Sequence, residues 1–210
     1  MSAEEISERS GDVAVAPRMK AADRRELILA AATAVFGAKT YVGTTTDEVA
    51  RAAGVSQPYV VRLFGTKEKL FIAVIERAYA RVIDEFRRAM PGPEETRIDR
   101  MGAAYTDLLA ERGMLPVIAH STALGGEPEI GRVARRGFSA IWHFLRDEAG
   151  FTPEAAREFY ATGMLINAVV GLRLTGDYGD EVSATEVLDS CFPGAVEQVR
   201  TLLPAADEPW

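Results

Sequence analysis

The sequence is poor in the residues that build disulfides and metal centres. It contains one cysteine and two histidines among 210 residues. A single cysteine excludes an intramolecular disulfide and is typical of proteins in a reducing cytoplasm. So small a set of Cys and His also disfavours a zinc site of the Cys/His type. We therefore predict a cytoplasmic protein with no metal and no cofactor.

Membrane and catalytic signals are missing as well. The uncharged apolar-rich runs, such as residues 159–172, fall short of the roughly 20 residues that a bilayer span needs. No basic segment followed by an apolar one stands at the N-terminus, so no signal peptide is expected. The sequence has no Gly-rich phosphate loop, no His-Glu metal spacing and no nucleophile elbow. These absences predict a protein that does not enter membranes and is not an enzyme.

The charge is unevenly distributed along the chain. The formal net charge is −7, which by itself argues against nucleic acid as a partner. Residues 18–70, however, hold nine Lys or Arg and five Asp or Glu, whereas residues 71–210 hold 14 Arg and 22 Asp or Glu. A basic segment on an acidic body is a sign of nucleic-acid or membrane contact, although a surplus of four charges could also arise by chance.

Helical periodicity follows the polar, acidic residues 1–19, which we interpret as a disordered arm. No sustained apolar/polar alternation of the strand type is present. Gly37 is expected to stop the first helix, Thr152 and Pro153 to start a later one, and Pro193 to split the last. Residues 205–210 are expected to be a frayed tail. The pattern predicts an all-α fold of roughly nine or ten helices, with helical stretches at 22–36, 45–64, 67–90, 96–111, 116–123, 128–149, 152–175 and 183–203.

Residues 44–64 have the pattern of a helix-turn-helix. Thr45 and Glu48 match a capping box. Gly54 supplies a turn that a side chain would obstruct, and Ser56 is placed to cap a second short helix with Pro58 in its first turn. Two short helices joined by a Gly-containing turn form a unit whose second helix enters the DNA major groove.

The second helix is expected to have a buried and an outward face. Val60, Leu63 and Phe64 can share the buried face. Gln and Arg suit adenine and guanine edges, while a valine can meet a thymine methyl group and a tyrosine can donate to a phosphate. The alternative is an αα-hairpin inside a larger bundle, whose polar side chains are merely solvated. The residues predicted to face outward are Gln57, Pro58, Tyr59, Val61 and Arg62.

Two lysines stand where a helix prefers anions. Lys67 and Lys69 lie in the first turn of the next helix and oppose its dipole, with Glu68 offsetting part of the cost. This placement is explained if an external phosphate docks there on free backbone N–H groups and a lysine. The helix start at Thr45 and Thr46 offers a second, hydroxyl-rich phosphate contact.

Five segments of residues 24–71 occur in an order and spacing typical of one known domain. They are Ala34-Val35-Phe36-Gly37, Thr44-Thr45-Thr46-Asp47-Glu48-Val49-Ala50, Ala53-Gly54-Val55-Ser56, Leu63-Phe64 and Lys67-Glu68-Lys69-Leu70-Phe71. With them, residues 24–71 resemble the DNA-binding domain of the TetR family of bacterial transcriptional regulators.

The resemblance implies a domain organisation and a mechanism. Residues 20–66 would be a three-helix DNA-binding domain, and residues 67–204 a helical domain that binds a small molecule and forms a homodimer. The ligand would move the long helix after the DNA-binding unit, which would release a repressor from a near-palindromic operator in double-stranded DNA.

The resemblance also assigns individual residues. Thr45 and Lys67 match phosphate-contacting positions. Val61 stands where the family commonly has an aromatic residue that touches the DNA backbone, so that contact is not carried over, and Tyr59 is the candidate substitute. The predicted DNA-binding set is Thr45, Thr46, Gln57, Pro58, Tyr59, Val61, Arg62 and Lys67.

The helices after Pro93 match no sharp motif, so they identify no ligand. Side chains of the candidate types more often fill a core than line a pocket. The uncharged helix 159–172 carries the small residues Ala161, Gly163, Ala168 and Gly171, which favours it, with the final helix, as the dimer contact. The candidate pocket residues are Tyr105, His120, Trp142, His143, Phe159, Tyr160, Met164 and Asn167.

Two other functions stay open on the sequence. The chain could be a helical small-molecule-binding protein or enzyme whose helix-turn-helix is vestigial. It could also be a transcriptional activator of the same fold.

Overall fold

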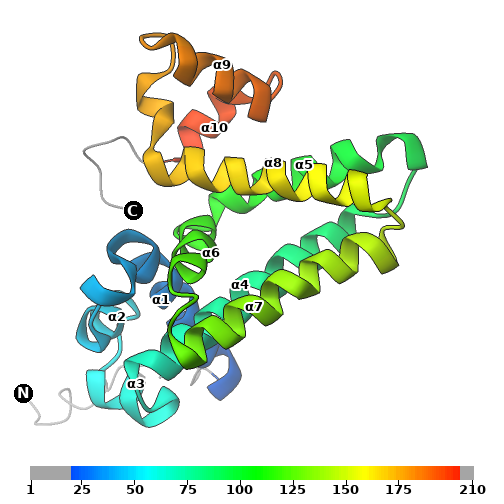
Figure 1. The fold of residues 1–210 in the computed structure, drawn as a ribbon. Helices are drawn as coiled ribbons and strands as arrows, with labels where there is room; N and C mark the ends of the chain where they lie inside the picture. Colours follow the sequence, from blue (N-terminus) through cyan, green and yellow to red (C-terminus); the bar gives the residue numbers. More distant parts are fainter. Residues whose placement is uncertain (1–19, 204–210) are drawn as a thin grey trace, which may run out of the picture.

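The computed structural model describes residues 20–203, which form α-helices joined by turns and short 3₁₀ or π segments, with no strand in this range (Figure 1). The predicted all-α fold is confirmed. The predicted arm 1–19 and tail 205–210 lie outside the described residues. The helices are α1 (Ala21–Gly43), α2 (Thr46–Ala52), α3 (Gln57–Phe64), α4 (Lys67–Ala89), α5 (Arg97–Asp107), α6 (Met114–Ala123), α7 (Pro128–His143), α8 (Pro153–Leu172), α9 (Val182–Cys191) and α10 (Val196–Leu202).

The helices are arranged in two groups that share α4. Helices α1, α2 and α3 gather at one end of the molecule, and the long α4 leads away from them with α7 packed along it (Figure 1). Helices α5 and α8 cross above this pair, while α9 and α10 lie beyond the end of α8 (Figure 1). Helix α6 packs on α1, α4 and α8. Helix α4 therefore connects the first three helices to the rest of the chain.

The first helix is longer than the sequence predicts. Gly37 was expected to end it, but α1 continues to Gly43 through one non-helical residue, Thr40, with φ 60° and ψ 176°. A Cβ atom on Gly37 would lie 2.4 Å from the Cα of Gly113, in the turn that precedes α6. The glycine is thus needed for a backbone-to-backbone contact between α1 and that turn, and not for a helix stop.

The later helix boundaries follow local chemistry. Thr152 caps α8, since its hydroxyl accepts a hydrogen bond from the Ala155 amide at 3.2 Å. Pro193 falls between α9 and α10, which confirms the predicted split. The stretch predicted as one helix over 128–149 ends as an α-helix at His143 and continues as a π segment over Phe144–Glu148.

The core runs without interruption along α4. Leu70, Phe71, Val74 and Ile75 are each fully buried, and the ring of Phe71 lies 4.7 Å from that of Phe36 on α1. Burial of side chains of this size is worth about 1.5–3 kcal/mol each, and Val82 and Phe86 are buried toward the other end, so the helix is anchored along its length. Apolar packing therefore holds the first three helices on α4, and α4 also packs against the helices of the larger bundle.

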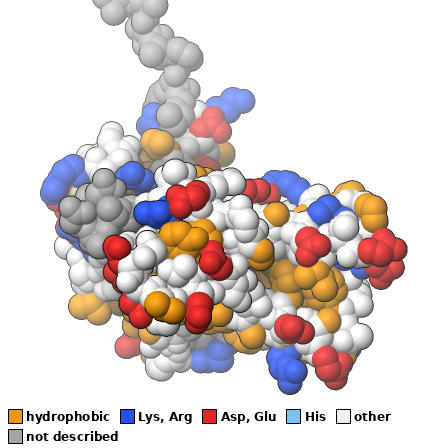
Figure 2. Space-filling view, turned by 90° about the horizontal axis from the view of Figure 1, so that it is seen from above, with side chains coloured by type: hydrophobic (Ala, Val, Ile, Leu, Met, Phe, Trp, Pro, Cys, Tyr) orange, Lys and Arg blue, Asp and Glu red, His pale blue; other side chains and the backbone are white. Residues whose placement is uncertain are grey.

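The surface seen from above in Figure 2 carries scattered acidic side chains with apolar ones exposed between them. Among the described residues, no helix combines the length and the apolar character that a bilayer crossing needs.

Candidate functional site

Helix α2 begins with the predicted capping box. The Thr45 hydroxyl accepts a hydrogen bond from the Glu48 amide at 3.2 Å, and the Glu48 carboxylate accepts one from the Thr45 amide at 2.9 Å. Lys39 donates to the same carboxylate. The hydrogen bond from Lys39, followed by those from Thr45, lowers the pKa of Glu48 to about 2. The start of α2 is thereby tied to the end of α1.

The turn between α2 and α3 is tight and needs a glycine. Gly54 has φ +64°, a conformation that few other residues adopt without strain. Ser56 occupies the N-cap of α3, but its side chain makes no capping hydrogen bond, so the predicted cap is wrong in this detail. Pro58 lies in the first turn of α3, as predicted.

Helix α3 buries a narrower face than the sequence predicts. Val60 and Phe64 are buried, as expected, but Leu63 is 39% exposed. Helix α3 is short and covered on one side only. Val60 and Phe64, which are four residues apart, are therefore enclosed, while Leu63 lies at the edge of the covered side. Gln57 and Tyr59 are half-buried, and Pro58, Val61 and Arg62 are exposed.

The polar side chains of α3 are held in place by their neighbours. The Gln57 amide nitrogen donates to the Thr46 hydroxyl at 3.2 Å. The Arg62 guanidinium lies 4.9 Å from the ring centroid of Tyr59, and Arg24 of α1 lies 5.7 Å from the same ring. Cation–π contacts of this kind attract a guanidinium to an aromatic face. A tyrosine flanked by two arginines therefore stands at the exposed side of α3.

Lys67 has a role inside the protein. Its ammonium donates to the Tyr41 carbonyl at 3.0 Å, lies 3.5 Å from the Val42 carbonyl, and sits 4.6 Å from the Tyr41 ring centroid. These contacts account for a cation at the start of α4, because it binds carbonyls at the end of α1. An ammonium has three donors, so a third remains for another acceptor. Lys69 is exposed.

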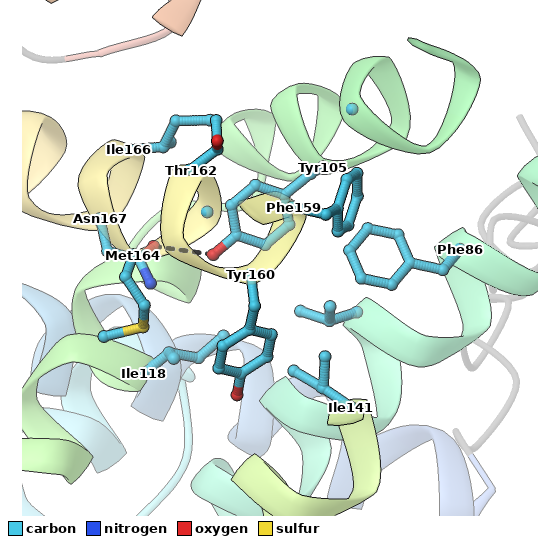
Figure 3. Close-up of a pocket in the computed structure, with 13 residues that line it drawn as sticks. Phe86, Tyr105, Ile118, Ile141, Phe159, Tyr160, Thr162, Met164, Ile166 and Asn167 are labelled. Atoms are coloured by element: carbon cyan, nitrogen blue, oxygen red, sulfur yellow. Dashed lines mark hydrogen bonds between the residues drawn. The ribbon is translucent and has the colours of Figure 1, made fainter. Parts of the chain in front are cut away.

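A cavity lies among α4, α5, α6, α7 and α8 (Figure 3). The space between its walls, including the part open to solvent, is about 530 Å³, of which about 60 Å³ is free for the centre of a water molecule. Five of the eight candidate pocket residues line it. The lining is Val82, Phe86, Gly102, Tyr105, Ile118, Ile141, Phe159, Tyr160, Thr162, Gly163, Met164, Ile166 and Asn167.

The cavity contains one polar pair in an apolar wall. The Tyr105 hydroxyl donates to the Asn167 side-chain carbonyl at 2.8 Å (Figure 3), and the two residues are 7% and 3% exposed. Burial raises the pKa of Tyr105 far above its ordinary value. Both groups are therefore neutral hydrogen-bonding partners across α5 and α8.

The other three candidate pocket residues lie away from this cavity. His120 is on α6, where burial lowers its pKa while the backbone of Phe36 acts in the opposite direction. Its Nδ1 atom is buried and has no hydrogen-bond partner. Trp142 is half-buried on α7 outside the cavity wall. His143 is exposed, with its Nδ1 atom 3.3 Å from Asp147.

Comparisons with known proteins point to one family. The model of the bacterial regulatory proteins of the tetR family matches residues 28–74. The HTH-type transcriptional activator FasR of Mycolicibacterium smegmatis is 33% identical over 87 residues, which are 41% of this chain and 39% of FasR. The matched stretch thus spans well under half of that relative.

Solved structures share the fold over most of the chain. A TetR-like transcriptional regulator from Rhodococcus sp. RHA1 superposes with a TM-score of 0.57 at 21% identity, covering 88% of this chain and 96% of that one. The fatty acid degradation regulator FadR from Bacillus halodurans has a TM-score of 0.57 at 18% identity, covering 92% and 100%.

The chain is thus similar to the tetR-family regulators over residues 28–74. Its family match begins at Ile28 in α1 and ends at Val74 in α4, so it includes the whole helix-turn-helix. All residues that line the cavity lie outside the matched range, but α4 contributes its first part to the match and Val82 and Phe86 to the cavity.

Sequence reasoning missed two arginines of α1 that contact α3. Arg24 lies over the Tyr59 ring, and the Arg25 guanidinium lies 5.3 Å from the centroid of the Phe64 ring. Both come from the first turns of α1, about thirty residues before α3. The paired arginines within the basic segment were the available signal, but only the folded structure places them over the Tyr59 and Phe64 rings of α3.

Proposed function

We propose that the chain is a ligand-responsive, DNA-binding transcriptional regulator that acts as a homodimer in the cytoplasm, where bacterial DNA is found. Its DNA contacts are Thr45, Thr46, Gln57, Pro58, Tyr59, Val61, Arg62 and Lys67, and it catalyses no reaction. The domain division at residues 66 and 67 belongs to this proposal.

The observation that carries the proposal is the outward face of α3. Gln57 keeps its carbonyl and one amide hydrogen after bonding Thr46, which is the pair of groups that reads an adenine edge. Arg62 is exposed, and its fork can leave the Tyr59 ring for a guanine edge. Arg24 and the third donor of Lys67 extend this face toward phosphates.

A dimer interface is supported by the exposed side of α8. Ala161, Leu165, Ala168 and Leu172 recur at helical spacing and all are exposed, with Leu165 at 45% and Leu172 at 71%. An apolar stripe on one helix face is typical of a helix that packs against a partner. Gly163 does not belong to it, because this glycine faces the Tyr105 ring.

Ligand response is supported by the position of the cavity on α4. Val82 and Phe86 line the cavity, and the same helix begins with Lys67 directly after the helix-turn-helix. Phe86 lies about 28 Å along α4 from that start, at 1.5 Å per residue. A ligand larger than the free space must displace the cavity wall and with it α4, which shifts the equilibrium between two positions of α3.

Whether the protein represses or activates transcription depends on the position of its operator relative to the promoter. We propose a repressor that a ligand releases from its operator. The name of the M. smegmatis relative, a transcriptional activator, favours activation as the second candidate. Transcription in vitro from the bound promoter separates the two, since added protein lowers transcript yield in the first case and raises it in the second.

Selection of bound fragments from a random DNA pool tests the proposal as a whole. We expect a near-palindromic site whose half-site centres are about 34–36 Å apart, with affinity that falls steeply with salt. Absence of sequence-selective binding at low salt, together with retained binding of a small molecule, would show a vestigial helix-turn-helix instead.

Single substitutions then test the residue roles. Arg62→Ala should cost about 1–3 kcal/mol on the selected site and far less on random DNA. Lys67→Ala should weaken both similarly and reduce the salt slope by about one. Arg132→Ala is the matched control, because this arginine is exposed on α7 and pairs with Glu129. Equal losses on both DNAs for Arg62→Ala would remove it from base recognition.

A further inference from the structure

The cavity has a mainly apolar, uncharged lining. No Lys, Arg, Asp, Glu or His side chain is among its lining residues. Apart from the Thr162 hydroxyl and the Tyr160 hydroxyl, which lies 3.4 Å from the Phe138 carbonyl, the polar groups are those of Tyr105 and Asn167. Whatever occupies this space meets aromatic and aliphatic surface and one hydrogen-bonded pair.

Asn167 has an unused donor in this pair. Its carbonyl accepts from Tyr105, while its amide nitrogen makes no hydrogen bond with any residue in the described range 20–203. Asn167 lines the cavity, and Figure 3 shows its amide nitrogen beside the oxygen that accepts from Tyr105. The residue as a whole is 3% exposed, and the nitrogen is not one of the fully enclosed side-chain atoms without a partner, so it keeps some accessible surface. An occupant with an acceptor oxygen at this point gains a hydrogen bond that a hydrocarbon cannot make.

A second hollow adjoins the cavity and is lined by acidic side chains. It lies between α5, α8 and the segment that joins α9 to α10, and it shares Gly102, Phe159, Thr162 and Ile166 with the cavity wall. The space between its walls, including the part open to solvent, is about 1510 Å³. Its charged lining residues are Asp99, Asp107 and Glu158.

These three carboxylates repel anions from the hollow beside the cavity. None of them forms an ion pair with another residue of the part of the chain that the structure describes, and neither hollow is lined by a lysine or an arginine. A carboxylate ligand would therefore lose its hydration without gaining a countercharge. A neutral molecule avoids this cost.

We propose that the cavity binds an uncharged, mainly apolar molecule with a carbonyl oxygen, which accepts a hydrogen bond from the Asn167 side-chain amide, and that it rejects carboxylates of the same shape. The proposal specifies the ligand of the regulatory site and so rests on the proposed function. Asn167 is the residue that sets specificity, and Tyr105 holds its amide in the required orientation.

Three probes of one shape test the proposal on the full-length protein. Acetophenone carries the carbonyl, ethylbenzene replaces it by a methylene group, and benzoate carries a negative charge at about pH 7. Dissociation constants are measured by NMR titration, with the side-chain amide signal of Asn167 as the local readout. We expect acetophenone to bind about tenfold more tightly than ethylbenzene, the net value of one buried hydrogen bond, and benzoate to bind more weakly than either.

Asn167→Leu made together with Tyr105→Phe is the decisive variant, because leucine removes the amide at nearly constant size and phenylalanine removes the hydroxyl that would otherwise be left as a free donor. The ratio of the acetophenone and ethylbenzene constants should fall to about one, while ethylbenzene still binds. Glu158→Gln is the matched control in the adjoining hollow and should leave that ratio unchanged while improving benzoate binding. The ratio within one variant does not depend on the stability of that variant.

Three results would overturn the proposal. They are benzoate binding as tight as that of acetophenone, a preference for the ketone that survives Asn167→Leu made together with Tyr105→Phe, and absence of acetophenone binding at millimolar concentration. None of these measurements uses DNA. Loss of operator binding alone would therefore reject the proposed regulatory function and leave the ligand class intact, whereas wrong probe selectivity with intact operator binding would do the reverse.

Discussion

The contact between Gly37 and Gly113 offers the most direct test of how the DNA-binding helices are attached to the body. A Cβ atom on Gly37 would lie 2.4 Å from the Gly113 Cα atom and 2.8 Å from its carbonyl oxygen. Both are backbone atoms, so no side-chain rotation can relieve the overlap. In Gly37→Ala, α1 must therefore move away from the turn before α6.

The magnitude follows from two opposing contributions. Overpacking of a close contact costs about 1–3 kcal/mol, and a backbone clash belongs at the upper end of that range. Replacing glycine by alanine inside a helix returns about 1 kcal/mol of helix propensity. We expect Gly37→Ala to lower the free energy of unfolding by about 2 kcal/mol, and to lower Tm by about 4–8 °C for a chain of this size.

Urea unfolding followed by circular dichroism measures this change at a fixed protein concentration. Gly102→Ala is the matched control, because Gly102 is inside α5 and nothing lies within 4 Å of a Cβ atom placed there. That variant should be as stable as the parent chain or slightly more stable. A Gly37→Ala variant with unchanged or increased stability would refute the close contact between α1 and the turn before α6.

Four further predictions concern the cap of α2, the half-buried His120 and the dimer. Thr45→Ala should destabilise the fold by about 1 kcal/mol through loss of the α2 cap, measured by urea unfolding. Because the pKa of Glu48 is lowered from 4.5 to about 2 in the folded state, its ionised form stabilises the fold above about pH 4.5. This contribution should disappear as the pH falls toward 2, whereas the variant Glu48→Gln should lack this part of the pH dependence. Burial lowers the pKa of His120, so the unfolded chain takes up the proton first as the pH falls. The free energy of unfolding should therefore decline below about pH 6.5. The variant His120→Phe should abolish this decline, whereas the control His143→Phe, at an exposed position, should retain it. Leu165→Asp should weaken self-association at least about tenfold in analytical ultracentrifugation, and an unchanged dimer would exclude α8 from the interface.

The helix-turn-helix could be predicted in detail because its signals are local. The capping box of Thr45 and Glu48, the turn at Gly54 and the buried Val60 and Phe64 depend on residues within a few positions of one another. The misassigned Leu63 shows the limit of this reasoning, since periodicity gives the direction of a side chain but not how far its neighbours extend over it.

The cavity could be predicted only in part. Tyr105, Phe159, Tyr160, Met164 and Asn167 were named for their residue types and do line one space, but His120 and His143 have equally suitable side chains and lie elsewhere. Whether a ligand occupies that space stays a prediction. Residue type indicates what a side chain could contact, and the packing of α5 against α8 decides what it does contact.

The sequence by itself determined the all-α class, the position of the helix-turn-helix with the capping box of α2, and the separation of a basic segment from an acidic remainder, because each depends on local periodicity and composition. The tertiary structure decided which contacts Gly37, Lys67 and Arg24 make. Gly37 permits a close contact with Gly113, Lys67 binds the end of α1, and Arg24 packs on Tyr59. Each of these pairs joins residues distant along the chain, and such contacts are set by how helices pack and not by the pattern within any one of them.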